Sequence, residues 1–181
     1  MIGIVGIIIV VIIIYILIQY NNLVKLKNTV KQSKSGIDVY LNQRFDLIPN
    51  LVDCVKGYTK HEKEALESVT KMRAEYSKGG NNIKKAEELN NSINNILAIA
   101  EAYPELKSSE QFLNLQKNLT KIESELQAAR RIYNSEVTKY NTKIEVIPTN
   151  IIASLFGFKR LDLFQIEESK RENIDIGREL K

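Results

Sequence analysis

The chain begins with an unbroken apolar segment. Residues 2–18 carry no charged side chain, and the first charge after them is Lys25. A helix needs about 17 to 25 apolar residues to cross the hydrocarbon layer of a bilayer, so this segment is long enough to span. We therefore expect residues 1–20 to form a transmembrane anchor that contacts the lipid bilayer through residues 2–18.

Two other interpretations of this segment are weaker. A secretory signal peptide carries a positive region before its apolar run and a small-residue cleavage site after it, whereas only Met1 precedes this run and residues 19–22 read Gln-Tyr-Asn-Asn. A core helix of a water-soluble protein would show a polar face, and this stretch has none.

The charges around the span predict its orientation. Lys25, Lys27, Lys31 and Lys34 follow the span, and no side-chain charge precedes it. Basic residues favour the cytoplasmic side, so we expect a single-pass protein of the cell membrane with a short N-terminus outside and the C-terminal body in the cytoplasm. These lysines account for much of the mild net charge of +4. Without a basic stripe elsewhere, we expect no nucleic-acid partner.

The rest of the chain has the periodicity of helices. Apolar residues recur at intervals of three, four and seven from Leu23 to Leu41, which continues the span into water as one amphipathic helix. Three similar sets follow, over residues 51–77, 83–102 and 108–147. We therefore predict an all-α fold: an N-terminal transmembrane helix that continues into an elongated, antiparallel, up-and-down four-helix bundle of residues 21–165. Residues 166–181 form a charged C-terminal tail.

Pro49 interrupts the helical pattern. A proline inside a helix costs about 3 kcal/mol, whereas in the first turn it costs little. Either a new helix begins at Pro49 or the first helix kinks there. We favour a break between Arg44 and Pro49, with Asp46 capping the free amides of the second helix.

The sequence offers little for catalysis or metal binding. His61-Glu62 begins like the zinc motif H-E-x-x-H, but Ala65 stands where the second histidine would be, and His61 is the one histidine of the chain. Cys54 lies among apolar residues at helical spacing, which predicts a small buried hydrophobe rather than a nucleophile. We expect no catalytic residues, no metal, no cofactor and no enzymatic activity.

The segment between the first two helices resembles the core motif of the LemA family. The resemblance rests on Arg44, Asp46, Leu47, Ile48, Pro49, Asn50 and Leu51, and it continues at Tyr133-Asn134, Tyr140-Asn141 and Phe156-Gly157-Phe158. The chain departs from the family pattern at Ser33-Lys34, where members usually carry Ala-Trp, and at Ile147, where they tend to have Phe. The resemblance implies a membrane protein with a short extracytoplasmic N-terminus and an antiparallel helical bundle, and it supplies no activity.

Two motifs are candidates for interaction or for structure. The first is the junction segment from Arg44 to Leu51, which either caps and fills the bundle end or binds a partner. The second is Phe156, Gly157 and Phe158. These residues either fold back as part of a plug or present two rings beside Lys159 and Arg160 to a membrane interface or a partner groove.

Three functions fit this sequence. We favour a membrane-tethered scaffold or interaction module, whose partner would be an unidentified membrane or cytoplasmic protein or a second copy of the chain. The alternatives are a lipid-binding module of the membrane surface and an accessory subunit of a membrane enzyme.

Overall fold

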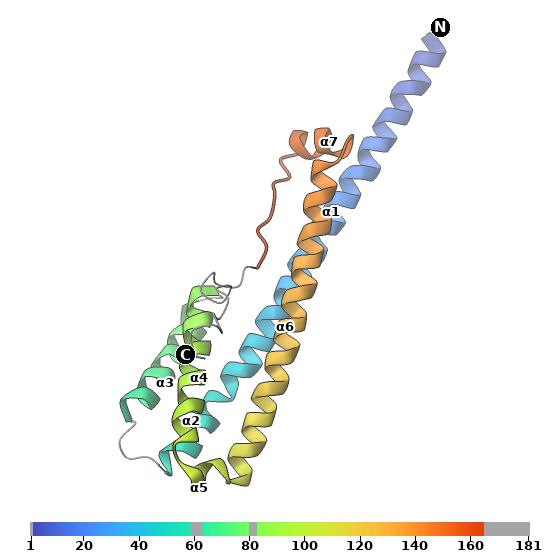
Figure 1. Ribbon diagram of the computed structural model, residues 1–181. Helices are drawn as coiled ribbons and strands as arrows, with labels where there is room; N and C mark the ends of the chain where they lie inside the picture. The colour runs from blue at the N-terminus through green and yellow to red at the C-terminus, as the bar shows by residue number, and fades with distance from the viewer. Residues whose placement is uncertain (1, 59–62, 80–82, 165–181) are drawn as a thin grey trace, which may run out of the picture. The chain divides into compact units, whose positions relative to one another are not determined.

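The computed structural model describes residues 2–58, 63–79 and 83–164, and all regular structure in these ranges is helical (Figure 1). The helices are α1 (Ile2–Asp46), α2 (Ile48–Lys56), α3 (Lys63–Gly79), α4 (Ile83–Glu101), α5 (Pro104–Lys107), α6 (Glu110–Glu145) and α7 (Thr149–Leu155). The prediction of an all-α fold is confirmed for the described residues. The charged tail from residue 166 lies outside them.

The chain divides into two compact units, each with its own core. One unit combines residues 1–32 with residues 130–181, and the other is residues 33–129. Helices α1 and α6 contribute to both units because each is continuous across the division.

The N-terminal part of α1 is an exposed apolar helix. Within the described ranges, α1 contains the one stretch that is long and apolar enough to cross a membrane, and none of that stretch is buried against protein. The same helix continues without a break to Asp46, so the predicted continuity of span and first helix is confirmed.

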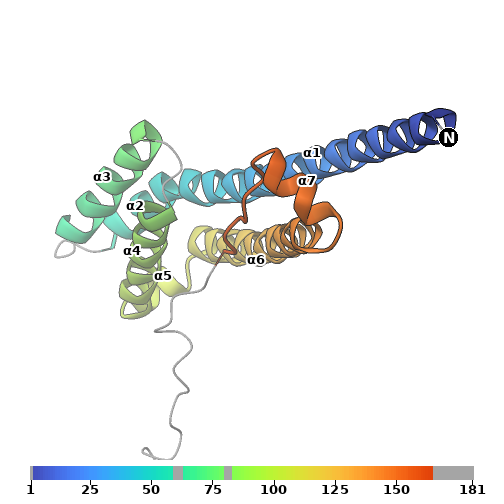
Figure 2. The same ribbon diagram turned by 90° about the horizontal axis from the view of Figure 1, so that it is seen from above.

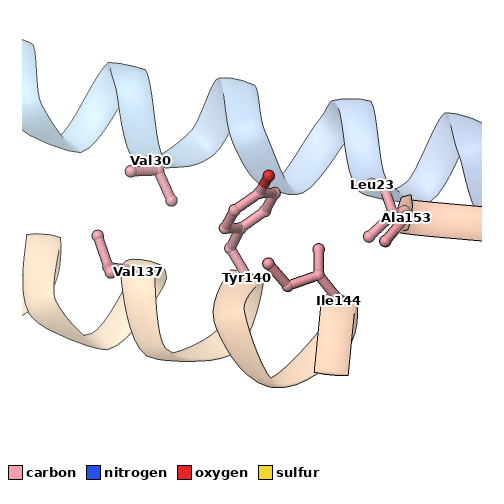
Figure 3. Close-up of a cluster of buried hydrophobic side chains, with 6 residues drawn as sticks. All are labelled: Leu23, Val30, Val137, Tyr140, Ile144 and Ala153. Atoms are coloured by element: carbon pink, nitrogen blue, oxygen red, sulfur yellow. The ribbon is translucent and has the colours of Figure 1, made fainter. Parts of the chain in front are cut away.

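The core of the first unit joins α1, α6 and α7. Its buried residues are Leu23 and Val30 from α1, Val137, Tyr140 and Ile144 from α6, and Ala153 from α7. Their spacing of three, four and seven residues keeps each set on one helix face. Figure 3 shows the Tyr140 side chain reaching from α6 toward α1 between Val30 and Leu23.

The core of the second unit joins α2, α3, α4 and α5 with the C-terminal part of α1 and the N-terminal part of α6. Helix α3 packs against both α2 and α4, and α4 also packs against α5. Phe45 of α1 and Tyr76 of α3 meet edge to face, with ring centroids 4.8 Å apart. The largest fully buried side chains of this unit are Ile48, Leu51, Leu66, Leu89, Ile93, Ile96, Leu106 and Leu126.

The prediction of one helix over residues 51–77 is wrong. Helix α2 ends at Lys56, Gly57 and Tyr58 form a turn, and α3 begins at Lys63. A glycine costs about 1 kcal/mol relative to alanine inside a helix, which makes Gly57 a natural end point. Because the apolar periodicity of the sequence continues across this turn, the pattern did not predict a helix end here. His61 lies outside the described residues.

Candidate interaction site at the α1–α2 junction

The junction is a break of a single residue. Helix α1 ends at Asp46, Leu47 forms the turn, and α2 begins at Ile48 with Pro49 in its first turn. A proline is tolerated there because the first amides of a helix have no intrahelical acceptor. The break predicted between Arg44 and Pro49 is therefore confirmed.

Asp46 does not cap α2, so that expectation is wrong. The N-cap is Leu47, which keeps helical backbone angles (φ −81°, ψ −12°), and no side chain caps the helix. An N-cap side chain reaches the free amides when its own backbone is extended, and the backbone of this turn is helical instead. Asp46 instead accepts a hydrogen bond from Arg73 Nη2 on α3 at 3.1 Å.

Arg73 also stabilises the end of α1. Its Nε donates to the carbonyl oxygen of Phe45 at 3.0 Å. A cation at a helix C-terminus is favourable because the last carbonyls carry partial negative charge. Arg73 thus links the C-terminus of α1 to α3.

Arg44 is buried and binds two other helices. Its guanidinium pairs with the carboxylate of Glu123 on α6, and its Nη2 donates to Asn94 Oδ1 on α4 at 3.3 Å. A charge removed from water needs a counter-charge and hydrogen-bond partners, and these two residues supply them. Arg44 therefore has a structural role in joining α1, α4 and α6.

The remaining junction residues divide between core and surface. Ile48 and Leu51 are buried, Leu47 is partly buried, and Pro49 and Asn50 are exposed. The motif thus combines the structural role and the exposed surface that the sequence left as alternatives.

The exposed part of the junction borders an open groove of about 510 Å³. Its lining comprises Leu47, Asn50, Asp53 and Cys54 on the junction side and Gln111, Asn114, Leu115 and Asn118 on α6. Gln111, Asn114 and Asn118 share one face of α6 because they are three, four and seven residues apart. Carboxamides and leucines therefore dominate the groove, and Asp53 is its one ionisable carboxylate among the described lining residues.

Cys54 is not the buried hydrophobic residue that its sequence context predicted. It is partly exposed and lines the groove. Partial burial, followed by the negative charge of Asp53, raises the pKa of the Cys54 thiol above 9.0. The thiol is therefore protonated at neutral pH, which makes it a poor nucleophile.

The second candidate motif ends α7. Gly157 has a positive φ of 70°, a conformation that glycine adopts without a Cβ penalty. The amide of Gly157 donates to Ser154 O at 3.3 Å and that of Phe158 to Ala153 O at 2.9 Å, which together form a Schellman motif. The sharp turn expected of Gly157 is confirmed.

The two phenylalanine rings lie against α1. Their centroids are 4.9 Å (Phe156) and 5.8 Å (Phe158) from that of Tyr20. Phe156 nevertheless stays 49% exposed. The segment thus folds back onto the helices, as the plug interpretation expects, and keeps apolar surface outside.

The chain continues after α7 in a way that its sequence pattern did not predict. Residues 159–164, which we call the strap, run beside α6 without helical structure (Figure 1). Asn141 Nδ2 donates to Leu161 O at 2.8 Å while its Oδ1 accepts from Leu161 N at 2.9 Å. Asn134 makes the same pair of bonds with Phe164, at 3.0 and 2.7 Å.

Two tyrosines complete the attachment of the strap. The hydroxyl groups of Tyr140 and Tyr133 donate to the carbonyl oxygens of Lys159 and Asp162, each at 3.1 Å. The Tyr-Asn pairs 133–134 and 140–141 lie seven residues apart. This spacing covers about 10.5 Å of helix, close to the roughly 10 Å of three extended residues. The repeat was the sequence signal for a bound backbone segment.

Comparison with known proteins identifies the family. A model of the LemA family matches residues 33–177. Protein LemA of Metamycoplasma hominis is 28% identical over 159 residues, which cover 86% of this chain and 73% of that protein. Magnetosome protein MamQ 2 of Paramagnetospirillum magneticum is 24% identical over a match that covers 83% of this chain and 66% of that protein. Magnetosome protein MamQ of Magnetospirillum gryphiswaldense is 23% identical over a match that covers 82% of this chain and 65% of that protein. This chain therefore spans about two thirds of the length of the two magnetosome relatives, and it belongs to the LemA family.

Proposed function

We propose that this protein is a membrane-anchored, non-enzymatic interaction module that binds an extended polypeptide segment in the groove beside the α1–α2 junction. The partner is a membrane or cytoplasmic protein, or a second copy of the chain. The helical body that follows the anchor faces the cytoplasm.

The observation that carries this proposal is the spacing of carboxamides along α6. Gln111 and Asn118 line the groove seven residues apart. Asn134 and Asn141 have the same spacing on the same helix, and both bind the backbone of the strap. The groove therefore shares the seven-residue carboxamide spacing, without the preceding tyrosines, of the α6 surface that holds the strap.

The chemistry of the groove suits a peptide backbone. A carboxamide offers both a donor and an acceptor, so it pairs with the N–H and C=O groups of a segment whatever its side chains are. Leu47 and Leu115 add apolar contact within the same groove. A few polar groups on an apolar surface are typical of binding sites.

Two observations support the anchor and its orientation. The apolar stretch of α1 is exposed in the structure, so it lacks a protein surface that would bury it. Lys25, Lys27, Lys31 and Lys34 follow the span, as on the cytoplasmic side of a membrane protein.

Site-specific photo-crosslinking in native membranes tests the groove. A photoreactive residue replaces Gln111 or Asn118 in the full-length chain, and the matched controls carry it at Gln127 or Ser135, exposed positions of α6 outside the groove. We expect a defined polypeptide adduct from the groove positions only. Equal adducts from the controls, or no adduct from the groove, would contradict the proposal.

A second experiment tests the orientation. Ser124→Cys in a Cys54→Ser background places the one thiol of the chain on an exposed part of α6. A membrane-impermeant reagent should label it only after the cells are permeabilised. Labelling in intact cells would reverse the proposed topology.

A further inference from the structure

Helix α7 has one buried side and one apolar exposed side. Thr149, Ile152 and Ala153 are buried. In contrast, Ile151 and Leu155 are 66% and 73% exposed and lie four residues apart on the helix, and Ile147, in the turn before α7, is 82% exposed. We call these three residues the α7 stripe. A contiguous exposed apolar surface of this kind indicates a contact with lipid or protein.

The position of α7 indicates which of these covers the stripe. Its end is held against α1 by tilted and edge-on contacts of the Phe156 and Phe158 rings with Tyr20, and Ala153 shares a core with Leu23. Figures 1 and 2 both show α7 beside α1 and the end of α6. Tyr20 follows the last residue of the apolar run, Ile18, by two positions, or about 3 Å along the helix. Leu23 follows it by about 7.5 Å.

The distances of Tyr20 and Leu23 beyond the end of the apolar run correspond to the membrane interface. The headgroup layers add about 10 to 15 Å in total to a hydrocarbon core of about 30 Å, so each is about 5 to 8 Å thick. If residues 2–18 span the core, Tyr20 and Leu23 lie within the headgroup layer. The stripe, on a helix that contacts both, then lies at the boundary between headgroups and acyl chains.

The charge pattern around the stripe also suits an interface. Residues 146–158 contain no charged side chain, while Lys159 and Arg160 follow at once. On α1, Lys25 and Lys27 follow Ile18 by about 10.5 and 13.5 Å along the helix, and Lys27 Nζ is 5.8 Å from the centroid of the Phe158 ring. Interfacial helices combine an apolar face with flanking cations and aromatic rings in this way. Arg160 is already paired with Glu145, so Lys25, Lys27 and Lys159 are the cations we assign to the lipid headgroups.

We propose that the α7 stripe inserts into the cytoplasmic leaflet of the bilayer that α1 spans. The protein then contacts the membrane twice, through a span at its N-terminus and through an interfacial helix after α6. This inference rests on the membrane anchoring of the proposed function and is independent of the groove.

The absence of tryptophan from the chain allows a clean test. Leu155→Trp and Ile151→Trp each give the full-length protein a single tryptophan in the stripe, and both positions are exposed, so the larger ring needs no repacking. Ile132→Trp, an exposed position of α6, is the matched control, and Leu17→Trp reports the span. Each variant is reconstituted in vesicles with lipids brominated near the headgroup or deep in the acyl chain.

We expect shallow bromines to quench the stripe tryptophans about twofold or more and to leave Ile132→Trp nearly unquenched. Stripe tryptophans with the red-shifted, unquenched emission of the control would overturn the inference, because the stripe would lie in water. A blue-shifted but unquenched emission would also overturn it, because protein would then cover the stripe. Failure of quenching at Leu17→Trp would instead refute the anchoring itself.

Discussion

Asn141 and Leu161 are joined by two hydrogen bonds of opposite direction, one donated by the carboxamide at 2.8 Å and one accepted by it at 2.9 Å. The side chain of a helical residue thereby pairs with extended backbone as a neighbouring strand would. This pairing holds the strap against α6 without a sheet.

Replacing Asn141 by alanine should release the strap locally. Two hydrogen bonds are lost, and each contributes about 0.5 to 1.5 kcal/mol, so the variant should lose about 1 to 3 kcal/mol of stability. Hydrogen exchange at the Leu161 amide should accelerate accordingly. The control is Thr142→Ala, which changes the adjacent exposed position. Unchanged exchange at Leu161 would show that the pair contributes nothing.

The strap should also detach at alkaline pH. Burial raises the pKa of Tyr140 above 10.0, and burial followed by the charge of Asp162 raises that of Tyr133. Because the folded values exceed the unfolded ones, these tyrosines contribute fully below about pH 10, and their contribution is lost as the pH rises through the folded values. Tyr140→Phe should flatten the pH dependence of Leu161 exchange above about pH 10. An unchanged profile would contradict this assignment.

Two glycine substitutions should have opposite effects. Gly157→Ala forces a Cβ into a φ of 70° and should cost about 1 to 2 kcal/mol, although nothing lies within 4 Å of the added atom. Gly36→Ala lies inside α1 with equally open surroundings and should stabilise by about 0.5 to 1 kcal/mol. Thermal unfolding of the full-length protein in detergent would measure both. A common sign would refute the conformational argument.

The Arg44–Glu123 pair should respond asymmetrically to substitution. Glu123→Ala leaves a buried guanidinium without its carboxylate and should cost about 3 to 5 kcal/mol. Arg44→Met should cost less, because the Glu123 side chain is 30% exposed and can be hydrated. The double variant should recover part of the loss in a double-mutant cycle. Additive single effects would mean that the two side chains are not coupled.

The junction should be far more sensitive at Leu51 than at Asp46. The Asp46 side chain is 72% exposed and its ion pair with Arg73 lies at the surface, so Asp46→Ala should cost only about 0 to 1 kcal/mol. Leu51 is buried, and Leu51→Ala should cost about 2 to 5 kcal/mol through the cavity it leaves. Thermal melts would compare the two. Equal losses would imply that Asp46 has a further structural role.

Local features of this fold could be predicted from sequence, because they depend on neighbouring residues. The exposed span, its continuation to Asp46 and the break before Pro49 follow from apolar periodicity and from the geometry of proline. The end of α2 at Gly57 was missed because Val55 and Leu66 kept the apolar pattern in register across the turn. An apolar pattern that is compatible with one helix and with two does not discriminate between them.

Contacts between distant residues could not be predicted in the same way. The partner of Arg44 lies 79 positions away, and the partner of Asp46 lies 27 positions away. Nothing local distinguishes Glu123 from the other carboxylates of α6. The groove likewise depends on α2 meeting the face of α6 that carries Gln111 and Asn118, and only the assembled fold brings these residues together.

The order in which this protein is synthesised separates the two halves of its first unit in time. Tyr20 contacts Phe156, so its partner is added 136 residues later. At about 5 to 20 residues per second, this delay is roughly 7 to 27 seconds. During that interval Tyr20 and Leu23 have no partner from α7. The N-terminal unit therefore closes late in translation, and a chain that stops before α7 would leave this apolar surface open to chaperones and proteases.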